Sequence, residues 1–318
     1  MHWLAELDGR RIVVEVPGSS ANLGAGYDCL AVALALTNRI ELEVLGWSRG
    51  EIEMVVEGEG DGELVADRQN RFVRGVQAAL VAARGDVPDG VGWRIRMRNE
   101  IPLSRGLGSS AAATVGGLVA GNALAGEPLT TNDLLRLATE IEGHPDNAAA
   151  ALLGGFVVVG PVGEGIEAIR FEAPRDLRAV LFIPELRLPT SEMRGVLPEA
   201  VPLADAVANL ARVALGVAGL ATGRYDLLRT LTVDRLHEPY RAGSYPQLPR
   251  LIDAARGAGA LGACLSGAGS TVVAFADSMS GIARIEAAFG AAAADTDLPG
   301  RVAVVSPRNQ GARIVAGR

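Results

Sequence analysis

One stretch constrains this chain more than any other: residues 101–113, Ile-Pro-Leu-Ser-Arg-Gly-Leu-Gly-Ser-Ser-Ala-Ala-Ala, a loop that runs into small residues. Gly106 and Gly108 carry no Cβ, so the backbone there can turn sharply and approach a ligand closely. Ser109 and Ser110 can cap the helix that the alanines predict. The free N–H groups of a helix's first turn favour an anion. The stretch therefore predicts a loop that binds a nucleotide triphosphate, although a tight loop that caps a buried helix would use the same residues.

The chain contains no lysine, so every basic residue besides histidine is arginine. A P-loop ends in Gly-Lys-Ser/Thr, and its lysine reaches the terminal phosphates. Protein kinases need a lysine on a strand, and Schiff-base catalysis needs a lysine amine. The sequence therefore excludes these three classes.

The composition is that of a soluble globular protein. The 318 residues suffice for two domains, and 49% of them are hydrophobic. The net charge of −7 argues against nucleic acid as a partner. The two cysteines, Cys29 and Cys264, lie far apart, which fits a reducing compartment. Residues 1–11 lack the apolar core of a signal peptide, and the apolar run 111–124 is too short to cross a bilayer. We expect a cytoplasmic protein with no membrane partner.

The hydrophobic pattern predicts a mixture of strands and helices. Strands are predicted at residues 11–16, 39–44, 51–57, 92–99, 154–159, 169–171, 177–183 and 271–275. Helices are predicted at 29–36 and 71–83, from the glycine loop to 125, from Thr130 or Thr131 to about 142, and at 203–221 and 245–257. The pattern of the sequence changes near residues 160–170. This change predicts an N-terminal domain, 1–165, and a C-terminal domain, 166–318.

Two further segments carry polar groups that folding alone would not require. In residues 17–28, Asn22 and Asp28 bracket a glycine-rich turn and can bind a substrate amine or hydroxyl, although an Asx turn explains them equally well. Residues 140–147, Glu-Ile-Glu-Gly-His-Pro-Asp-Asn, gather carboxylates, an imidazole and an amide at one helix exit. Such a group suits magnesium and polar substrates.

Arginines stand next to turn residues in segments 189–194 and 237–241. The forked guanidinium group matches a carboxylate at two points, so Arg194 and Arg241 can hold a substrate carboxylate together. Each alone would be typical of a solvated surface charge. Residues 265–271 form a glycine turn that feeds a strand, and this turn can close over the loop at 101–113 or serve only as a tight connection.

Taken in order, residues 17–28, 102–112 and 266–271 resemble the three motifs of a family of small-molecule kinases. That family includes galactokinases, homoserine kinases, mevalonate kinases and phosphomevalonate kinases. The resemblance covers nearly the whole chain. It implies an α+β fold of two domains, the first like domain 2 of ribosomal protein S5 and the second ferredoxin-like, with the active site between them.

Within the family the chain is most similar to the homoserine kinases, through residues 22–28, 142–147, 153–156 and 237–241. This resemblance implies transfer of the γ-phosphoryl group of ATP to the side-chain hydroxyl of L-homoserine. The product, O-phospho-L-homoserine, would feed threonine biosynthesis. The resemblance also suggests a homodimer.

The same resemblance implies a role for individual residues of this chain. The residues that would contact the substrate are Asn22, Asp28, His144, Arg194 and Arg241. The two arginines would bind its carboxylate, and Asp28 and Asn22 would bind its amine and hydroxyl. The nucleotide would contact Asn70, Pro102, Leu103, Ser104, Arg105, Gly106, Leu107, Gly108, Ser109, Ser110, Gly267 and Gly269. Mg²⁺ would be held by Ser110 and Glu142, with Glu140 as the alternative carboxylate.

Catalysis would then come mainly from alignment and from charge neutralisation. The residues implied are Asn22, Asp146, Asn147 and Arg105, the last as a contact of the γ-phosphate in a chain without lysine. Whether Asp146 is a general base, or Asn147 only orients the hydroxyl, stays open. One departure from relatives is Ser270, which stands where a proline is frequent and is expected to be tolerated in a turn.

Two alternative functions fit parts of the sequence. Another kinase of the same family, acting on mevalonate or shikimate, would use the arginines for a carboxylate but would leave Asp28 without an amine. Uncharged polyols would use neither arginine. A non-catalytic ligand sensor on the same fold would be expected to have a degraded glycine loop or to lack the metal carboxylate. In this sequence the loop and the carboxylate are both intact, which argues against a sensor.

Overall fold

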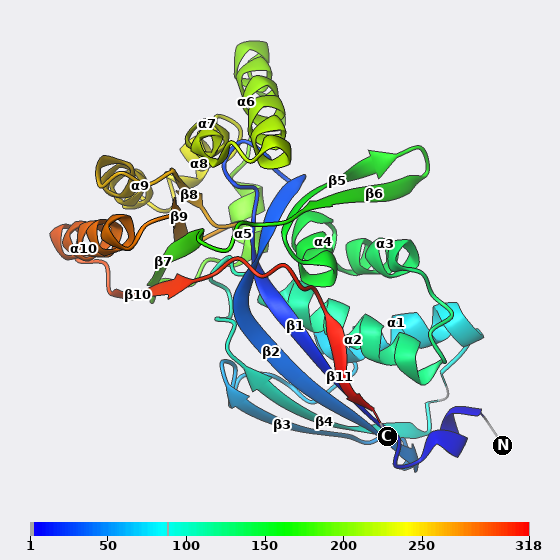
Figure 1. The fold of residues 1–318 in the computed structure, drawn as a ribbon. Coiled ribbons are helices and arrows are strands. Elements are labelled where there is room, and N and C mark those ends of the chain that lie inside the picture. The colour runs from blue at the N-terminus through cyan, green and yellow to red at the C-terminus, as the bar shows by residue number, and fades with distance from the viewer. Residues whose placement is uncertain (1–2, 88, 318) are drawn as a thin grey trace.

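The computed structural model describes residues 3–87 and 89–317, and these form two β-sheets with helices packed against them (Figure 1). The first sheet follows the order β11-β1-β2-β4-β3, and β5 pairs with both β2 and β6. All of these pairs are antiparallel except β3 with β4, which is parallel. The strands are β1 (Arg11–Ala21), β2 (Leu30–Trp47), β3 (Ile52–Gly58), β4 (Val91–Asn99), β5 (Phe156–Val162), β6 (Gly165–Phe171) and β11 (Arg313–Gly317).

Four helices lie against one face of the first sheet (Figure 1). They are α1 (Arg71–Arg84), α2 (Ser109–Leu124), α3 (Thr131–Glu142) and α4 (Asp146–Leu153), and the 3-10 helix η1 (Trp3–Leu7) packs near β2. Of the two caps that the sequence allows for α3, Thr130 and Thr131, the structure uses Thr130, which forms a capping box with Asp133. The sheet face away from these helices carries cross-strand ion pairs, among them Arg94 with Glu53 and Glu43.

The second sheet is antiparallel and has the order β10-β7-β9-β8. Its strands are β7 (Arg178–Pro184), β8 (Gly262–Leu265), β9 (Val272–Ala276) and β10 (Gly300–Val305), with α9 (Leu248–Gly257) and α10 (Met279–Asp295) packed on it. The segments between β7 and β8 form α5 (Thr190–Gly195), α6 (Leu203–Thr222), η2 (Tyr225–Leu227), α7 (Leu228–Leu231) and α8 (Glu238–Arg241). Two sheets with their helices form the mixed two-domain fold that the sequence predicts.

Sheet membership crosses the boundary predicted between residues 165 and 166. The strand β6 pairs with β5 in the first sheet. The last strand, β11, returns from the second sheet to pair with β1. The domain limits at 165 and 166 stay a prediction. The C-terminal part of the chain contributes a strand to each sheet, β10 to the second and β11 to the first.

The helix predicted at residues 29–36 is wrong, because this segment is the first half of β2. The run Leu30–Leu34 is buried throughout, and a continuous apolar run does not distinguish a helix from a buried strand. Here β1 and β5 hydrogen-bond to the two edges of the segment and fix it as a strand. The strand β1 also continues past Pro17 to Ala21 after a register shift, so the predicted loop begins only at Asn22.

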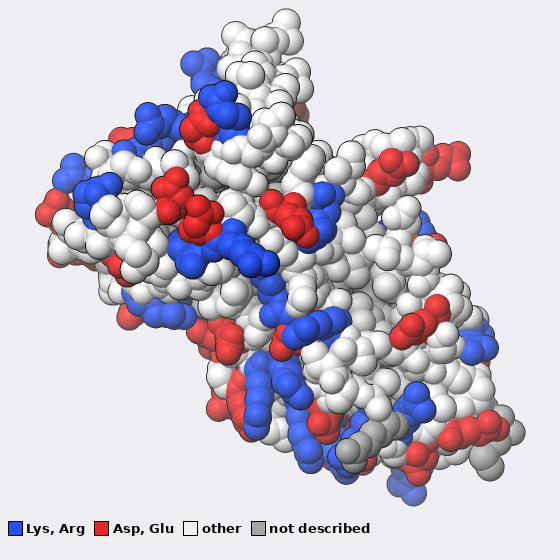
Figure 2. Space-filling view, viewed as in Figure 1, with Lys and Arg blue, Asp and Glu red and all other residues white. Residues whose placement is uncertain are grey.

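The helix α6 projects from the rest of the molecule (Figure 1), and its tip carries few charges on the visible face (Figure 2). It is the one helix among residues 3–87 and 89–317 that is long and apolar enough to cross a bilayer, judged by length and composition alone. The Asn209 side chain ties it to the fold by donating to the Ala25 carbonyl and to Asp234. Gly216 packs it closely against Leu231.

Glycines allow α1 and α2 to touch through their backbones. A Cβ at Gly75 would lie 2.3 Å from the Thr114 carbonyl oxygen, and one at Gly117 would lie 2.0 Å from the Phe72 carbonyl oxygen. Since α2 begins where the glycine loop ends, this close contact with α1 helps to position the N-terminus of α2. Part of the small-residue run of α2 is thus a packing surface.

We predict that Gly117→Ala lowers the free energy of unfolding by about 1–3 kcal/mol or more, because the methyl group overpacks a backbone contact. The matched control is Gly290→Ala in α10, where a Cβ meets nothing within 4 Å. That change should raise stability by about 0.5–1 kcal/mol through helix propensity. Urea unfolding of both variants checks this, and equal effects would contradict the close-packing argument.

Candidate active site

A cavity of about 500 Å³ lies between the two sheets and gathers most of the residues predicted to be functional. A second cavity of about 430 Å³ adjoins it, since Arg71, Ser104, Ser109 and Ser110 line both. The predicted residues in the first cavity are Asn22, Asp28, Pro102, Ser104, Arg105, Gly106, Leu107, Gly108, Ser109, Ser110, Glu142, His144, Asp146, Asn147, Arg194, Arg241 and Gly267. Asn70 and Leu103 line the second cavity, and Gly269 lines neither.

The loop between β4 and α2 is held from both sheets. The Leu107 carbonyl accepts from the Ser19 N–H on β1, and the Arg105 carbonyl accepts from the Thr271 N–H beside β9. The Ser266 hydroxyl donates to the Gly106 carbonyl over 2.6 Å. A Cβ at Gly106, where φ is +72°, would lie 2.1 Å from the Ser266 carbonyl oxygen. The glycine turn at 265–271 therefore packs directly on the loop.

The N-terminus of α2 differs from the prediction in one respect. The helix begins at Ser109, and its N-cap is Gly108 in the left-handed conformation, with no side-chain cap. The prediction that Ser109 or Ser110 caps the helix is therefore wrong, since both lie inside its first turn. No side chain caps this helix end in the described part of the chain, and Ser109, Ser110 and Ala111 of its first turn line the first cavity, an arrangement that suits an anion.

Glu142, the last residue of α3, faces the first turn of α2. Its Oε1 accepts from the Ser110 hydroxyl (3.1 Å) and from the Thr114 hydroxyl (2.6 Å), and Arg71 Nη1 lies 3.6 Å away. Glu140 instead pairs with Arg136 on the exposed side of α3. Of the two candidate carboxylates, the cavity contains Glu142.

An ion pair between loop and helix closes one side of the first cavity. The guanidinium group of Arg194 on α5 binds both carboxylate oxygens of Asp28, at 2.6 and 3.0 Å, and also donates to the Tyr27 hydroxyl. Both side chains are about one-third exposed. The hydrogen bond to Asp28 is the main reason that the pKa of Arg194 is raised.

Arg241 lies deeper in the same wall and is 1% exposed. Its Nε donates to the Met193 carbonyl, and its Nη1 donates to the Gly267 carbonyl (2.9 Å). The Asn22 amide also donates to the Gly267 carbonyl (2.9 Å), and its oxygen accepts from the Asp28 N–H. The bond from the Asp28 N–H to Asn22 spans six residues, so it is not an Asx turn, and it places Asn22 and Asp28 beside the two arginines.

His144 and Asp146 form a second polar group at the start of α4. His144 Nδ1 lies 3.0 Å from Asp146 Oδ1, which also accepts from the Asn147 N–H. Burial disfavours the charged imidazole, but the hydrogen bond and charge of Asp146 outweigh it and raise the pKa of His144. The Asn147 side-chain oxygen accepts from the Ser19 hydroxyl (2.8 Å), which fixes the amide against β1.

Two nucleotide contacts implied by the resemblance have other partners here. The Arg105 guanidinium donates to the carbonyls of Pro184 and Glu185, both over 2.7 Å, and so ties the loop to the end of β7. The Asn70 side chain caps α1 by accepting from the Phe72 N–H. The Ser270 hydroxyl donates to the Leu186 carbonyl and so ties the turn at 265–271 to the segment that follows β7.

Sequence reasoning missed several residues of the site. Arg71, Thr190 and Ser191 line the first cavity, and Thr114 and Ser19 hold residues that do. Thr190 and Ser191 were within reach, because they lie in the segment singled out for Arg194. Thr114 was also within reach, since it follows Ser110 by one helical turn on α2.

Comparison with known proteins places the chain in a family. Residues 71–155 match the GHMP kinases N terminal domain, and residues 217–295 match the GHMP kinases C terminal domain. A homoserine kinase of Moorella thermoacetica is 41% identical over 304 residues, which is 95% of this chain and 99% of that protein. The chain is a GHMP kinase.

Solved structures of GHMP kinases have the same fold. Homoserine kinase from Cytophaga hutchinsonii superposes with a TM-score of 0.84 at 29% identity, covering 96% of this chain and 97% of that one. Galactokinase from Lactococcus lactis, solved with galactose, gives a TM-score of 0.71 at 16% identity, covering 95% of each chain. The second likeness extends to the fold alone.

Beneath the site, Glu238 begins α8 and is buried. Its Oε1 accepts from the Leu265 N–H (2.7 Å) at the end of β8. Burial is the largest influence on this carboxyl and raises its pKa to about 8. The folded protein therefore keeps a proton on Glu238 over a pH range in which the unfolded chain has released it.

This linkage predicts that wild-type stability declines as the pH rises from about 5 to 8, relative to a Glu238→Gln variant. Below the ordinary pKa of 4.5, the folded and unfolded states are both protonated at this group and no penalty arises. Glutamine keeps an oxygen for the Leu265 N–H but does not titrate. Thermal unfolding midpoints across this range check the prediction, and parallel curves for the two proteins would contradict it.

Proposed function

We propose that this GHMP kinase transfers the γ-phosphoryl group of ATP to the side-chain hydroxyl of L-homoserine, giving O-phospho-L-homoserine and ADP, a step of threonine biosynthesis. The proposal follows the relatives named homoserine kinase. Within the structure, the observation that carries it is the pair of opposite charges formed by Asp28 and Arg194 in the cavity wall.

An amino acid is a zwitterion, and it can exchange with this ion pair without a change of net charge. Its carboxylate would take Asp28's place on Arg194 and add Arg241, while its ammonium group would take Arg194's place on Asp28. Each charge that loses a partner gains another, so no half-buried charge is left unpaired. The side-chain hydroxyl would then extend toward the phosphate loop.

Other small-molecule substrates of the family fit this wall less well. A carboxylic acid without an amine would occupy the arginines and leave Asp28 unpaired. A neutral sugar would replace neither partner, and its binding would have to leave the ion pair intact. The wall therefore favours an amino acid over mevalonate, shikimate or galactose.

ATP would span both cavities. The second cavity combines apolar Ile40, Leu64 and Met97 with the amides of Asn70 and Asn99, which suits a nucleotide base. Among the shared residues, Ser104 lies on the glycine loop and Ser109 and Ser110 lie at the α2 N-terminus, where the phosphates would lie. Arg105 already binds two carbonyls at the end of β7, so we assign it first to holding the loop.

Mg²⁺ fits the oxygen groups beside these phosphates. Mg²⁺ is usually bound by one or two carboxylates together with phosphate oxygens and water. Glu142 and Ser110 would supply the carboxylate and the hydroxyl, and Thr114 holds the Glu142 carboxylate in place. Bound there, the ion would neutralise charge that develops on the phosphates.

The chain's own residues would act mainly by alignment. Phosphoryl transfer passes through a loose transition state, so positioning and electrostatic stabilisation can supply most of the acceleration. The N–H groups of the α2 first turn would bind the transferring group, and Asn147 would orient the acceptor hydroxyl. The hydroxyl proton would leave to solvent or to a phosphate oxygen, without a dedicated base.

A coupled ADP-release assay with Mg·ATP tests the function against L-homoserine, L-threonine, L-serine, mevalonate, shikimate and galactose. We expect turnover mainly on L-homoserine. Arg194→Ala should raise its KM about 10- to 100-fold, which is the usual effect of losing a hydrogen bond to a charged group. Arg250→Ala, which removes a surface partner of Asp295, is the matched control and should leave the KM unchanged.

Turnover on mevalonate or shikimate would keep the fold and the ATP site but overturn the amine-recognition argument. ATP binding without turnover of any substrate would favour the ligand sensor.

Asp146 tests whether the reaction uses a general base. Because its Oδ1 accepts from His144 and from the Asn147 N–H, we expect Asp146→Asn to raise the KM for L-homoserine and to lower kcat only a few fold. A kcat loss of about 10²- to 10⁴-fold with an unchanged KM would identify Asp146 as the base. Steady-state kinetics at saturating ATP separates the two results.

Three expectations from the sequence complete the proposal. They are a cytoplasmic location, a homodimer, and the lack of nucleic-acid and membrane partners. The contacts of Asn209 and Gly216 on α6 support a soluble protein, because they tie this apolar helix into the fold.

A further inference from the structure

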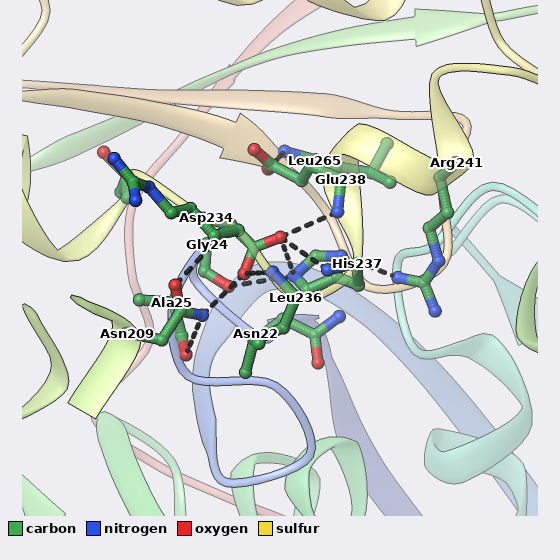
Figure 3. A network of polar contacts seen from close by, with 12 residues as sticks. Asn22, Gly24, Ala25, Asn209, Asp234, Leu236, His237, Glu238, Arg241 and Leu265 are labelled. Atoms are coloured by element: carbon green, nitrogen blue, oxygen red, sulfur yellow. Dashed lines mark hydrogen bonds and ion pairs between the residues drawn. The ribbon is translucent and has the colours of Figure 1, made fainter. Parts of the chain in front are cut away.

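We propose that His237 is a positioning residue for Arg241: its neutral ring accepts a hydrogen bond from the guanidinium group and holds it in the substrate-carboxylate wall. The inference rests on the proposed function, because it assigns Arg241 to the substrate. Figure 3 shows His237 between the Gly24 carbonyl and Arg241, with Asp234 at the centre of the network. Nothing in the motif His-Glu-Pro-Tyr-Arg itself assigns a task to this histidine.

The partners of the two ring nitrogens fix the protonation of His237. Nε2 lies 2.9 Å from the Gly24 carbonyl oxygen, which can only accept, so Nε2 carries the proton. Nδ1 lies 3.0 Å from Arg241 Nη1, which can only donate, so Nδ1 is bare. Both contacts require the neutral tautomer with hydrogen on Nε2. The ring is 0% exposed, and burial, which outweighs the charge of Asp234, lowers its pKa to about 4.

The backbone around His237 is fixed by Asp234. Its carboxylate accepts from the N–H groups of Leu236, His237 and Glu238, at 2.7–2.9 Å, and from the Asn209 amide at 2.7 Å. These bonds hold the start of α8, where Arg241 follows His237 by four residues. Residues four apart on a helix share a face, so the capped turn brings ring and guanidinium together.

The contacts of Arg241 show which of its N–H groups remain available for a ligand. Its Nε donates to the Met193 carbonyl, and Nη1 donates to the Gly267 carbonyl and to His237. Within residues 3–87 and 89–317, Nη2 has no hydrogen-bond partner, and Arg241 lines the first cavity. Two of its five N–H groups therefore remain for a ligand.

Without the acceptor at Nδ1, one N–H of a buried guanidinium would be unsatisfied, and the group would turn to find a partner. Turning would carry Nη2 away from the cavity wall. His237 thus acts on substrate recognition through Arg241, and it does not touch the substrate itself.

Two substitutions separate the ring's two contacts. In His237→Asn the side-chain oxygen can stand near the position of Nδ1 and accept from Arg241, while the Gly24 contact is lost. In His237→Gln the longer amide can still donate to the Gly24 carbonyl, but the acceptor at Nδ1 is lost. A residue that only anchors the loop would need the Gly24 contact, so it would tolerate glutamine better than asparagine.

We expect His237→Gln to raise the KM for L-homoserine about tenfold or more while the KM for ATP stays within about twofold. His237→Asn should stay within about threefold of wild type for both substrates. The opposite order of the variants, or equal losses on both substrates that follow the thermal unfolding midpoint, would overturn the proposal.

A measurement on the unmodified protein does not depend on whether the variants fold. The chain has 3 histidines, so nitrogen-15 NMR of histidine-labelled protein can resolve the His237 ring. We expect a neutral ring with hydrogen on Nε2 at pH 7 that does not titrate down to about pH 5. A protonated ring, or hydrogen on Nδ1, would overturn the proposal.

The kinetics of wild type and of His237→Gln together distinguish a failure of the proposed function from a failure of the positioning role. If wild type does not phosphorylate L-homoserine, the substrate assignment is wrong, and the positioning role falls with it. If wild type phosphorylates L-homoserine and His237→Gln leaves its KM unchanged, only the positioning role is wrong.

Discussion

The site depends on a backbone contact between the two halves of the fold. The glycine loop between β4 and α2 is held by the Ser19 N–H from the first sheet and by the Thr271 N–H and Ser266 hydroxyl from the turn between β8 and β9 of the second. Gly106 permits this contact, since any side chain there would collide with the Ser266 carbonyl. The loop that would bind phosphate is therefore also the joint between the sheets, and neither sheet alone can hold it in shape.

Around this joint, three carboxylates each have identified polar partners. Glu142 has two hydroxyls, Asp28 has Arg194, and Asp146 has His144 with its raised pKa. His237, in contrast, is kept neutral by burial and serves as an acceptor. The same residue type thus has two protonation tendencies within one site. Burial outweighs the nearby Asp234 at His237, whereas the hydrogen bond and charge of Asp146 outweigh burial at His144.

The sequence predicted the parts of the site that are local in the chain. The glycine loop, the Thr130 cap and the polar exit of α3 depend on neighbouring residues, and the structure has all three. The sequence alone could not predict that Asp28 pairs with Arg194, since 166 residues separate them and the pairing follows from tertiary packing. The first half of β2 was mistaken for a helix for the same reason, because its strand partners are distant in sequence.

The absence of lysine bears on how the cavity carries charge. Four arginines line the first cavity within the described chain: Arg71, Arg105, Arg194 and Arg241. A lysine amine can lose its proton when it is buried, whereas a guanidinium group stays charged at every pH that proteins encounter. Burial lowers the pKa of Arg241, yet the group has no accessible neutral form. The protein can therefore set the orientation of the Arg241 guanidinium group but not its charge. A neutral histidine acceptor sets that orientation without adding a further charge.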